Sequence, residues 1–268
     1  MNHILAQGRS IKYYLLLILA GLILGVWLAK TPAGLLGKAD AIAYAVCHRI
    51  PDRSFFLGDR PLPLCARCTG MYLGALAGLL YQFRLGRRGG MPSLKIGLVL
   101  GAFFLAFAVD GINSYLHLFP SAPGLYEPKN YLRLLTGSGL GVAIAAMLYP
   151  TFNQVVWANW SAERTLSSWR QLIGLLGLVL VIDLAVLTQN PLILYPLALV
   201  SSATVWVILG TVYTIVWVLI LHRENTFTSS RQLGWLLLAG FVVALAQIAL
   251  MDVGRFAMTG TWAGFFAR

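Results

Sequence analysis

Charged residues are scarce in this sequence. Only 11% of its 268 residues are charged, whereas 59% are hydrophobic, and the mean hydropathy is +0.77. Because soluble domains carry about 25% charged residues, this composition excludes an ordinary soluble domain and indicates an integral membrane protein. The few charges are mainly basic, with 20 Lys and Arg against nine Asp and Glu. Basic residues commonly flank membrane spans and meet anionic head groups, so we expect membrane lipids as partners and no nucleic acid.

Cysteine is equally scarce, and its placement is informative. The chain has three cysteines, Cys47, Cys65 and Cys68, all in one short stretch. An odd number of cysteines cannot close into a complete set of disulfides. Crowding beside arginine and histidine also argues against small apolar core residues. The pattern therefore indicates a metal site or a redox-active thiol.

Long apolar runs predict an all-α, polytopic transmembrane helix bundle with about seven spans. These runs cover residues 13–29, 69–83, 96–109, 131–149, 171–189, 192–221 and 232–251. The segment 31–46 is too short to cross and is expected at the membrane interface. We divide the chain into an N-terminal span and linker (1–40), a membrane core with the Cys motif (41–150) and a C-terminal membrane extension (151–268).

Counting spans places several polar clusters on one membrane face. The cysteine-rich loop precedes the second span, Asp110 ends the third and Arg133 begins the fourth, so all three should meet. Asp183, and Asp252 with Arg255, are expected on the same face. Without the four arginines of the cysteine-rich loop, ten basic residues would lie inside and six outside. This bias predicts a multi-pass plasma-membrane protein with a cytoplasmic N-terminus and the loop on the outer face.

The spacing Cys65-x-x-Cys68 at the start of an expected helix suits metal binding. Two thiolates at this spacing can face one centre, and a helix N-terminus favours their negative charge. Cys47 adds a third sulfur and His48 is the first candidate for a fourth ligand, with zinc as the expected metal. Rival fourth ligands are Asp52, Asp59, His117 and water. A redox alternative treats Cys65 and Cys68 as a dithiol that exchanges electrons with a quinone or a partner thiol, with Cys47 as the resolving thiol.

Arginines around the cysteines predict a polar pocket. Arg49, Arg53 and Arg67 can cradle a phosphate or carboxylate through bidentate contacts, or they can pair with nearby aspartates. An ion pair between Asp110 and Arg133 is expected to link the third and fourth spans. The candidate pocket residues are Arg49, Arg53, Arg67, Asp110, Asn113, Arg133 and Thr136.

The run CHRIPDRSFF…PLPLCARCTGMYLG, followed by DGINS and RLLTGSGLG, resembles an uncharacterised family of bacterial and archaeal membrane proteins, domain of unknown function 2085. The resemblance covers about residues 41–150. It implies that the Cys loop and its three spans form a self-contained unit, with residues 171–268 as an extension. The resemblance supplies no activity.

These observations favour a metal site that orders or catalyses chemistry at a pocket for a lipid head group or small anion. The second hypothesis is the thiol and quinone redox protein. A third is a non-catalytic subunit of a larger membrane complex, in which the metal holds a loop in place and other membrane subunits are partners.

Overall fold

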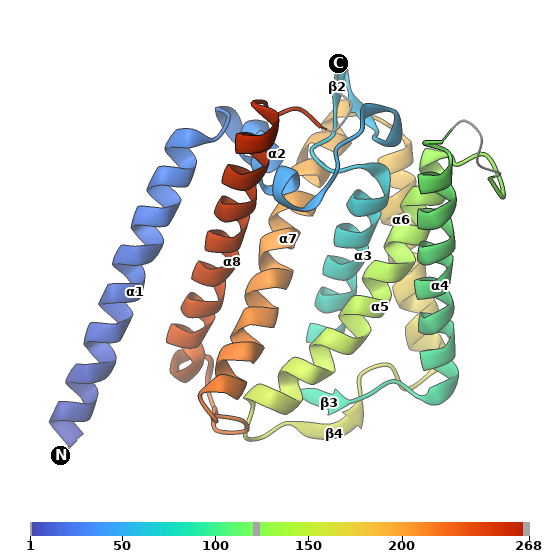
Figure 1. Ribbon diagram of the computed structural model, residues 1–268. Helices are drawn as coiled ribbons and strands as arrows, with labels where there is room; N and C mark the ends of the chain where they lie inside the picture. The colour runs from blue at the N-terminus through green and yellow to red at the C-terminus, as the bar shows by residue number, and fades with distance from the viewer. Residues whose placement is uncertain (1, 120–123, 265–268) are drawn as a thin grey trace.

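The computed structural model describes residues 2–119 and 124–264 and confirms an almost entirely helical bundle (Figure 1). The helices described are α1 (Asn2–Lys30), α2 (Gly34–Val46), α3 (Ala66–Phe83), α4 (Leu94–Leu116), α5 (Asn130–Val156), α6 (Trp169–Leu187), α7 (Pro191–Ile220) and α8 (Ser230–Thr259). Short strands join the helix ends: β1 (Phe56–Leu57) pairs antiparallel with β2 (Arg60–Pro61), and β3 (Arg88–Gly90) pairs parallel with β4 (Ser161–Arg164).

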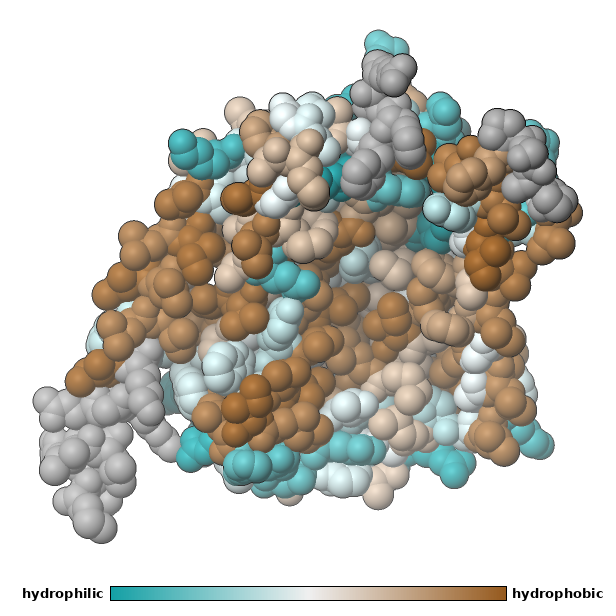
Figure 2. Space-filling view, viewed as in Figure 1, coloured by the Kyte–Doolittle hydropathy of each residue, from teal (hydrophilic) through white to brown (hydrophobic). Residues whose placement is uncertain are grey.

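Six of the described helices are long and apolar enough to cross a membrane: α1, α4, α5, α6, α7 and α8. Helix α3 lies among them with its axis along the bundle, but it is shorter and carries polar residues, including Arg67 and Gln82 (Figure 1). The visible surface has a broad hydrophobic band between two hydrophilic ends (Figure 2). These features confirm the predicted multi-pass membrane architecture, with α3 as the least apolar of the expected spans.

Several helix ends differ from the sequence-based boundaries. Helix α2 occupies most of the segment expected at the membrane interface. Helix α4 runs on to Leu116, so the polar residues from Asp110 to Ser114 lie within it rather than after it. Helix α5 contains Pro150 and ends at Val156. Apolar runs underestimate these lengths because polar residues at the ends of membrane helices find protein partners and need not interrupt the helix.

Helices α3 and α5 approach so closely that their backbones touch. A side chain on Gly141 of α5 would place its Cβ 2.1 Å from the Met71 carbonyl oxygen, and one on Gly70 of α3 would lie 2.2 Å from the Leu134 carbonyl oxygen. Small residues permit such an approach between membrane helices. The contact fixes the start of α3, which carries the CxxC pair, beside the start of α5.

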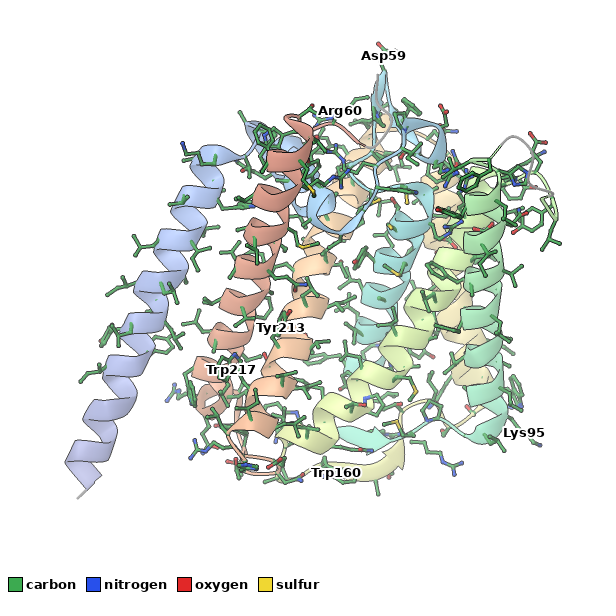
Figure 3. All side chains as sticks on the ribbon, in the orientation of Figure 1. Asp59, Arg60, Lys95, Trp160, Tyr213 and Trp217 are labelled. Atoms are coloured by element: carbon green, nitrogen blue, oxygen red, sulfur yellow. The ribbon has the colours of Figure 1, made fainter. Side chains whose placement is uncertain are left out.

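The other helices surround this pair. Helix α6 packs on the α3 and α5 side through a core that includes Leu172, Leu175 and Val142. Helix α7 contacts α3 and pairs with α8, whereas α1 leans against α8 and diverges from it toward the N-terminus (Figure 1). Lys95 and Trp160 mark the end of the bundle opposite the β1–β2 hairpin, whose tip carries Asp59 (Figure 3).

The glycine contact predicts a selective loss of stability. Gly141→Ala should destabilise the protein by about 1–3 kcal/mol, because the added methyl group overlaps the α3 backbone. Thermal unfolding of detergent-solubilised protein measures the effect. Gly97→Ala is the matched control, because Gly97 lies on α4 with nothing within 4 Å of a new Cβ. Equal melting temperatures for the two variants would show that the α3–α5 approach is looser than described.

Candidate functional site

The three cysteines converge where α2 ends and α3 begins. Cys47 caps the C-terminus of α2, Cys65 is the N-cap of α3 and Cys68 lies in the first turn of α3. Their sulfur atoms all lie within 4.8 Å of one another. Cys47 and Cys65 are buried, and the Cys65 backbone N–H donates to the Cys47 sulfur over 3.4 Å. The described residues contain this one group of three or more potential metal ligands.

Electrostatics within the cluster favour a thiolate at Cys47. Hydrogen bonds from the Cys65 and Cys68 thiols hold the pKa of Cys47 well below its ordinary value, and burial opposes this effect. The pKa of Cys65 is raised to about 12, first because of its hydrogen bond to Cys47. The N-terminus of α3 adds its partial positive charge to the same place. A cluster with this polarity is well suited to bind a thiophilic cation, which would allow all three thiols to ionise.

His48 lies beside the cluster. Its Nδ1 is 3.6 Å from the Cys47 sulfur, but the set of mutually close ligand atoms consists of the three sulfurs. Two of the rival fourth ligands are directed elsewhere. Asp59 projects from the tip of the β1–β2 hairpin (Figure 3), and the His117 Nδ1 lies 2.9 Å from the Asn113 carbonyl oxygen. His48 therefore lies beside the cluster without belonging to its set of mutually close ligand atoms.

Asp110 is the acidic centre of the neighbouring polar network. It forms an ion pair with Arg67, whose Nε lies 3.0 Å from Asp110 Oδ2. The Tyr126 hydroxyl donates to Asp110 Oδ1 over 2.8 Å, and the Thr136 hydroxyl lies 3.5 Å from Oδ2. Partial burial and the bond to Asp110 raise the pKa of Tyr126 to about 12. Both oxygens of this buried carboxylate are thus engaged.

The predicted ion pair between Asp110 and Arg133 is wrong. Arg133 instead donates to Asn130 Oδ1 over 2.7 Å and lies 3.4 Å from the Ser114 hydroxyl oxygen. The reason is the close approach of α3 to α5, which brings the Arg67 backbone against Gly137 and sends the Arg67 side chain to α4. Sequence order favours a pair between the consecutive helices α4 and α5. In the fold, Arg67 of α3 takes the place of Arg133 as the partner of Asp110.

Three guanidinium groups gather at Ser114, close to the Asp110 carboxylate. Arg53 donates to the Ser114 carbonyl oxygen over 2.6 Å, Arg67 donates to the Ser114 hydroxyl over 2.9 Å, and Arg133 approaches the same hydroxyl. Arg53 and Arg133 are 9% and 6% exposed. Burial, and then the charge of Arg67, lower the pKa of Arg53. Such a concentration of buried positive charge favours binding of an anion.

Two further residues of the predicted pocket have other contacts. Arg49 forms an ion pair with Asp40 at 2.7 Å and donates to the Pro63 and Trp262 carbonyl oxygens. Asn113 fixes the loop after α4, because it accepts from the Leu125 N–H and donates to the Tyr126 carbonyl oxygen. The structure thus brings Arg53, Arg67, Asp110, Arg133 and Thr136 together and places Arg49 and Asn113 in adjoining networks.

Arg255 of α8 supports the cysteine loop from outside the motif. Its Nη1 donates to the carbonyl oxygens of Tyr44 and Cys47, each over 2.6 Å, and its guanidinium lies 3.9 Å from the centre of the Tyr44 ring. The predicted convergence of Arg255 with the cysteine loop is therefore confirmed. Tyr126 was missed, because a tyrosine in a proline-rich loop gives no sequence signal for a contact with Asp110.

The bundle and its apolar surface define a multi-pass membrane protein with a three-cysteine cluster that could hold a metal ion. The chain belongs to the family described as predicted membrane proteins, DUF2085, whose model matches residues 47–147. This result confirms the resemblance carried by the cysteine motif.

Two archaeal relatives are similar to the chain. An uncharacterised protein of Methanocaldococcus jannaschii is 30% identical over 160 residues, which cover 54% of this chain and 96% of the relative. Another, from Methanothermobacter thermautotrophicus, is 32% identical over 102 residues, 38% of this chain and 83% of the relative. No solved structure matches the chain significantly.

The network around Asp110 predicts that this carboxylate is essential for stability. Asp110→Asn should destabilise the protein by about 3–5 kcal/mol, because it leaves buried guanidinium groups without their counter-charge. Chemical unfolding in mild detergent provides the measurement. Glu163→Gln is the control, since it removes one partner of an exposed ion pair with Arg88 and should cost under about 1 kcal/mol. A loss at Asp110 no larger than at Glu163 would mean that solvent screens the cluster.

Proposed function

We propose that Cys47, Cys65 and Cys68 hold a zinc ion at one membrane face, beside an arginine-lined pocket that receives an anionic group. The observation that carries this proposal is the mutual approach of three sulfur atoms within 4.8 Å at a helix N-terminus. The anionic group is a lipid head group or a small free anion, and the two share the phosphate or carboxylate chemistry that arginine binds.

The donor set suits zinc. Thiolates that share one tetrahedral zinc, at about 2.3 Å each, lie about 3.8 Å apart, so the three sulfurs need only a small adjustment. His48 is the proposed fourth ligand. With His48 as the fourth ligand, zinc would hold the loop to α3. With water in the place of His48, it would supply a Lewis acid. The side chains of the loop and of α3 position the metal, and the arginines orient the anion.

The pocket lies close to the cluster because both depend on the start of α3. Arg67 stands between Cys65 and Cys68 in sequence, and its side chain reaches Asp110 and Ser114. An anion bound by Arg53 and Arg133 would balance the excess of guanidinium groups there. We place the cysteine loop of the membrane core, residues 41–150, on the outer face of the plasma membrane, with the N-terminus in the cytoplasm.

A thiol redox function is the second candidate. Its support is the same proximity of Cys65 and Cys68, which would allow a dithiol to exchange electrons with a quinone or a partner thiol. In a non-catalytic subunit, by contrast, the metal would hold the loop in place and the polar network would serve only the fold.

Metal content separates zinc from redox chemistry. Detergent-purified wild type should contain about one zinc per chain, and the double variant Cys65→Ser/Cys68→Ser should contain none, because one sulfur cannot retain the ion. His48→Ala should bind zinc about 10–100-fold more weakly, whereas His222→Ala, in the loop before α8, should bind normally. Elemental analysis with thiol counting in the same samples provides both readouts. Absence of metal together with a reducible Cys65–Cys68 bond would overturn the zinc assignment and favour the redox function.

Anion binding is tested by protection against thermal unfolding. Inorganic phosphate should raise the melting temperature of the wild type, because a ligand that binds the folded state stabilises it. Arg133→Gln should abolish the rise, and Arg88→Gln, at the opposite end of the bundle, should retain it. Chloride at equal ionic strength controls for screening.

Phosphatidic acid in nanodiscs, tested in parallel, separates a lipid head group from a free anion. Protection by the lipid but not by free phosphate identifies a head-group pocket. An equal response of both variants to both probes would refute the pocket. If Arg133→Gln then had a normal zinc content, the metal site would be retained and only the anion pocket rejected.

A further inference from the structure

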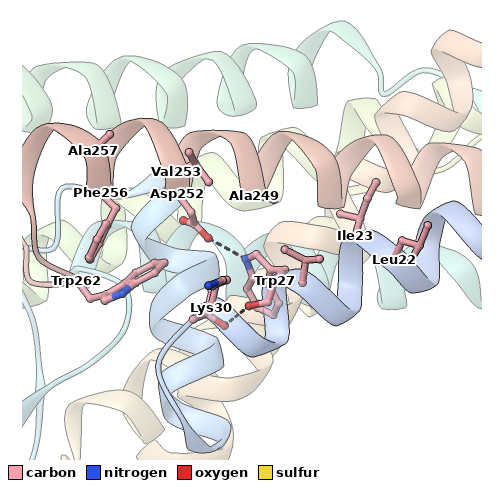
Figure 4. A pocket seen from close by; sticks show the side chains of 12 residues that line it. Leu22, Ile23, Trp27, Lys30, Ala249, Asp252, Val253, Phe256, Ala257 and Trp262 are labelled. Carbon is pink, nitrogen blue, oxygen red and sulfur yellow. Dashed lines mark hydrogen bonds between the residues drawn. The ribbon is translucent and has the colours of Figure 1, made fainter.

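An apolar cavity lies between α1 and α8, away from the cysteine cluster (Figure 4). Its volume is about 690 Å³, within the range of roughly 300–1,000 Å³ typical of ligand sites. Most of its wall is apolar, with Leu22, Ile23 and Val26 on α1 and Val253 on α8. None of its lining residues belongs to the cysteine cluster or to the arginine pocket, so the cavity requires an explanation of its own.

Asp252 is the acidic residue in this wall. It is 2% exposed, and its Oδ2 accepts from the Trp27 indole N–H over 2.8 Å (Figure 4). Its Oδ1 has no hydrogen-bond partner, and Asp252 forms no salt bridge, within residues 2–119 and 124–264. A buried carboxylate that lacks a donor costs several kcal/mol, so this atom points to a ligand that supplies an N–H or O–H group.

The charged groups around Asp252 come from three segments: Arg255 on α8, Arg49 in the cysteine loop and Lys30 at the end of α1. Arg255, one turn further along α8, donates to the Tyr44 and Cys47 carbonyl oxygens. Lys30, at the C-terminal end of α1, lines the cavity and is exposed. The cavity is therefore lined by an exposed ammonium group and a buried carboxylate.

The polar and apolar lining residues of the cavity follow the order of the head group and chains of a bilayer lipid. Helices α1 and α8 end at the membrane face that carries the cysteine loop (Figure 1), so Lys30 and Asp252 lie toward that face. Trp27 and Trp262 line the same region, as aromatic residues do at membrane interfaces. Leu22 lies about 12 Å from Lys30 along α1, toward the N-terminus, at the helical rise of 1.5 Å per residue.

We propose that this cavity binds a zwitterionic bilayer lipid with a primary ammonium head group. The ammonium would donate to Asp252, the phosphate would meet Lys30, and an acyl chain would follow the apolar wall of α1 and α8. A quaternary choline head group has no N–H to offer the free oxygen of Asp252. An anionic glycerol head group offers O–H donors to Asp252 but brings no positive charge to balance the carboxylate.

Lipid selectivity tests the assignment directly. Native mass spectrometry would titrate the full-length protein in a nonionic detergent with phosphatidylethanolamine, phosphatidylcholine and phosphatidylglycerol of identical acyl chains. Wild type should bind the ethanolamine lipid about tenfold more tightly than the choline lipid, as expected for one charge-assisted hydrogen bond. Asp252→Asn should lose this preference, because the amide still accepts from Trp27 but carries no charge. Asp183→Asn, a buried aspartate of α6 outside the cavity, should retain it.

A cavity-filling pair keeps the test informative if Asp252→Asn fails to fold. Ala249→Leu occupies the cavity and should reduce binding of every phospholipid at this site, whereas Ala106→Leu on the exposed face of α4 should leave it unchanged. Melting curves verify that both variants fold. Equal binding of ethanolamine and choline lipids by the wild type, unchanged selectivity in Asp252→Asn, or preferential retention of a prenyl quinone would each overturn the proposal.

Discussion

The backbone contact between α3 and α5 is the constraint on which the site depends. Glycines at Gly70, Gly74, Gly137 and Gly141 remove the side chains that would hold these helices apart. Association of helices within a bilayer gains little from hydrophobicity, so close packing has to supply much of the stability. This packing holds the start of α3, with Cys65, Arg67 and Cys68, against α5 and within reach of α4.

Charge within this packed region is balanced locally rather than by solvent. Asp110 accepts hydrogen bonds from Arg67, Tyr126 and Thr136. The backbone carbonyl of Ser114 accepts from Arg53, and its hydroxyl accepts from Arg67. Such a network is costly to leave incomplete at low dielectric, which explains why so many polar groups converge at one end of an otherwise apolar bundle. The same network brings more guanidinium groups than carboxylates together, and this excess of positive charge is the basis of the proposed anion site.

Much of the architecture was predictable because its signals are local. Apolar run lengths predict spans, and alternation of spans predicts which clusters share a face, so the meeting of the cysteine loop with Asp110 and Arg255 was foreseen. Pairing was harder. The partner of Asp110 is Arg67 and not Arg133, since rotation and depth of α3 depend on glycine contacts that hydropathy does not encode. The partnership of Arg49 with Asp40 and the contact of Tyr126 with Asp110 join segments without periodic signals.

The two candidate sites differ in their relation to the family core. The cysteine cluster and the arginines around Asp110 lie within residues 47–147, the part matched by the family model. The cavity beside Asp252 is built by α1 and α8, which lie outside that match, although α8 reaches back to the core through Arg255 and the Cys47 carbonyl. A lipid held between α1 and α8 would therefore contact the helix that supports the cysteine loop. The proposed lipid and the proposed metal would thus both depend on α8, although the cysteines themselves come from the core.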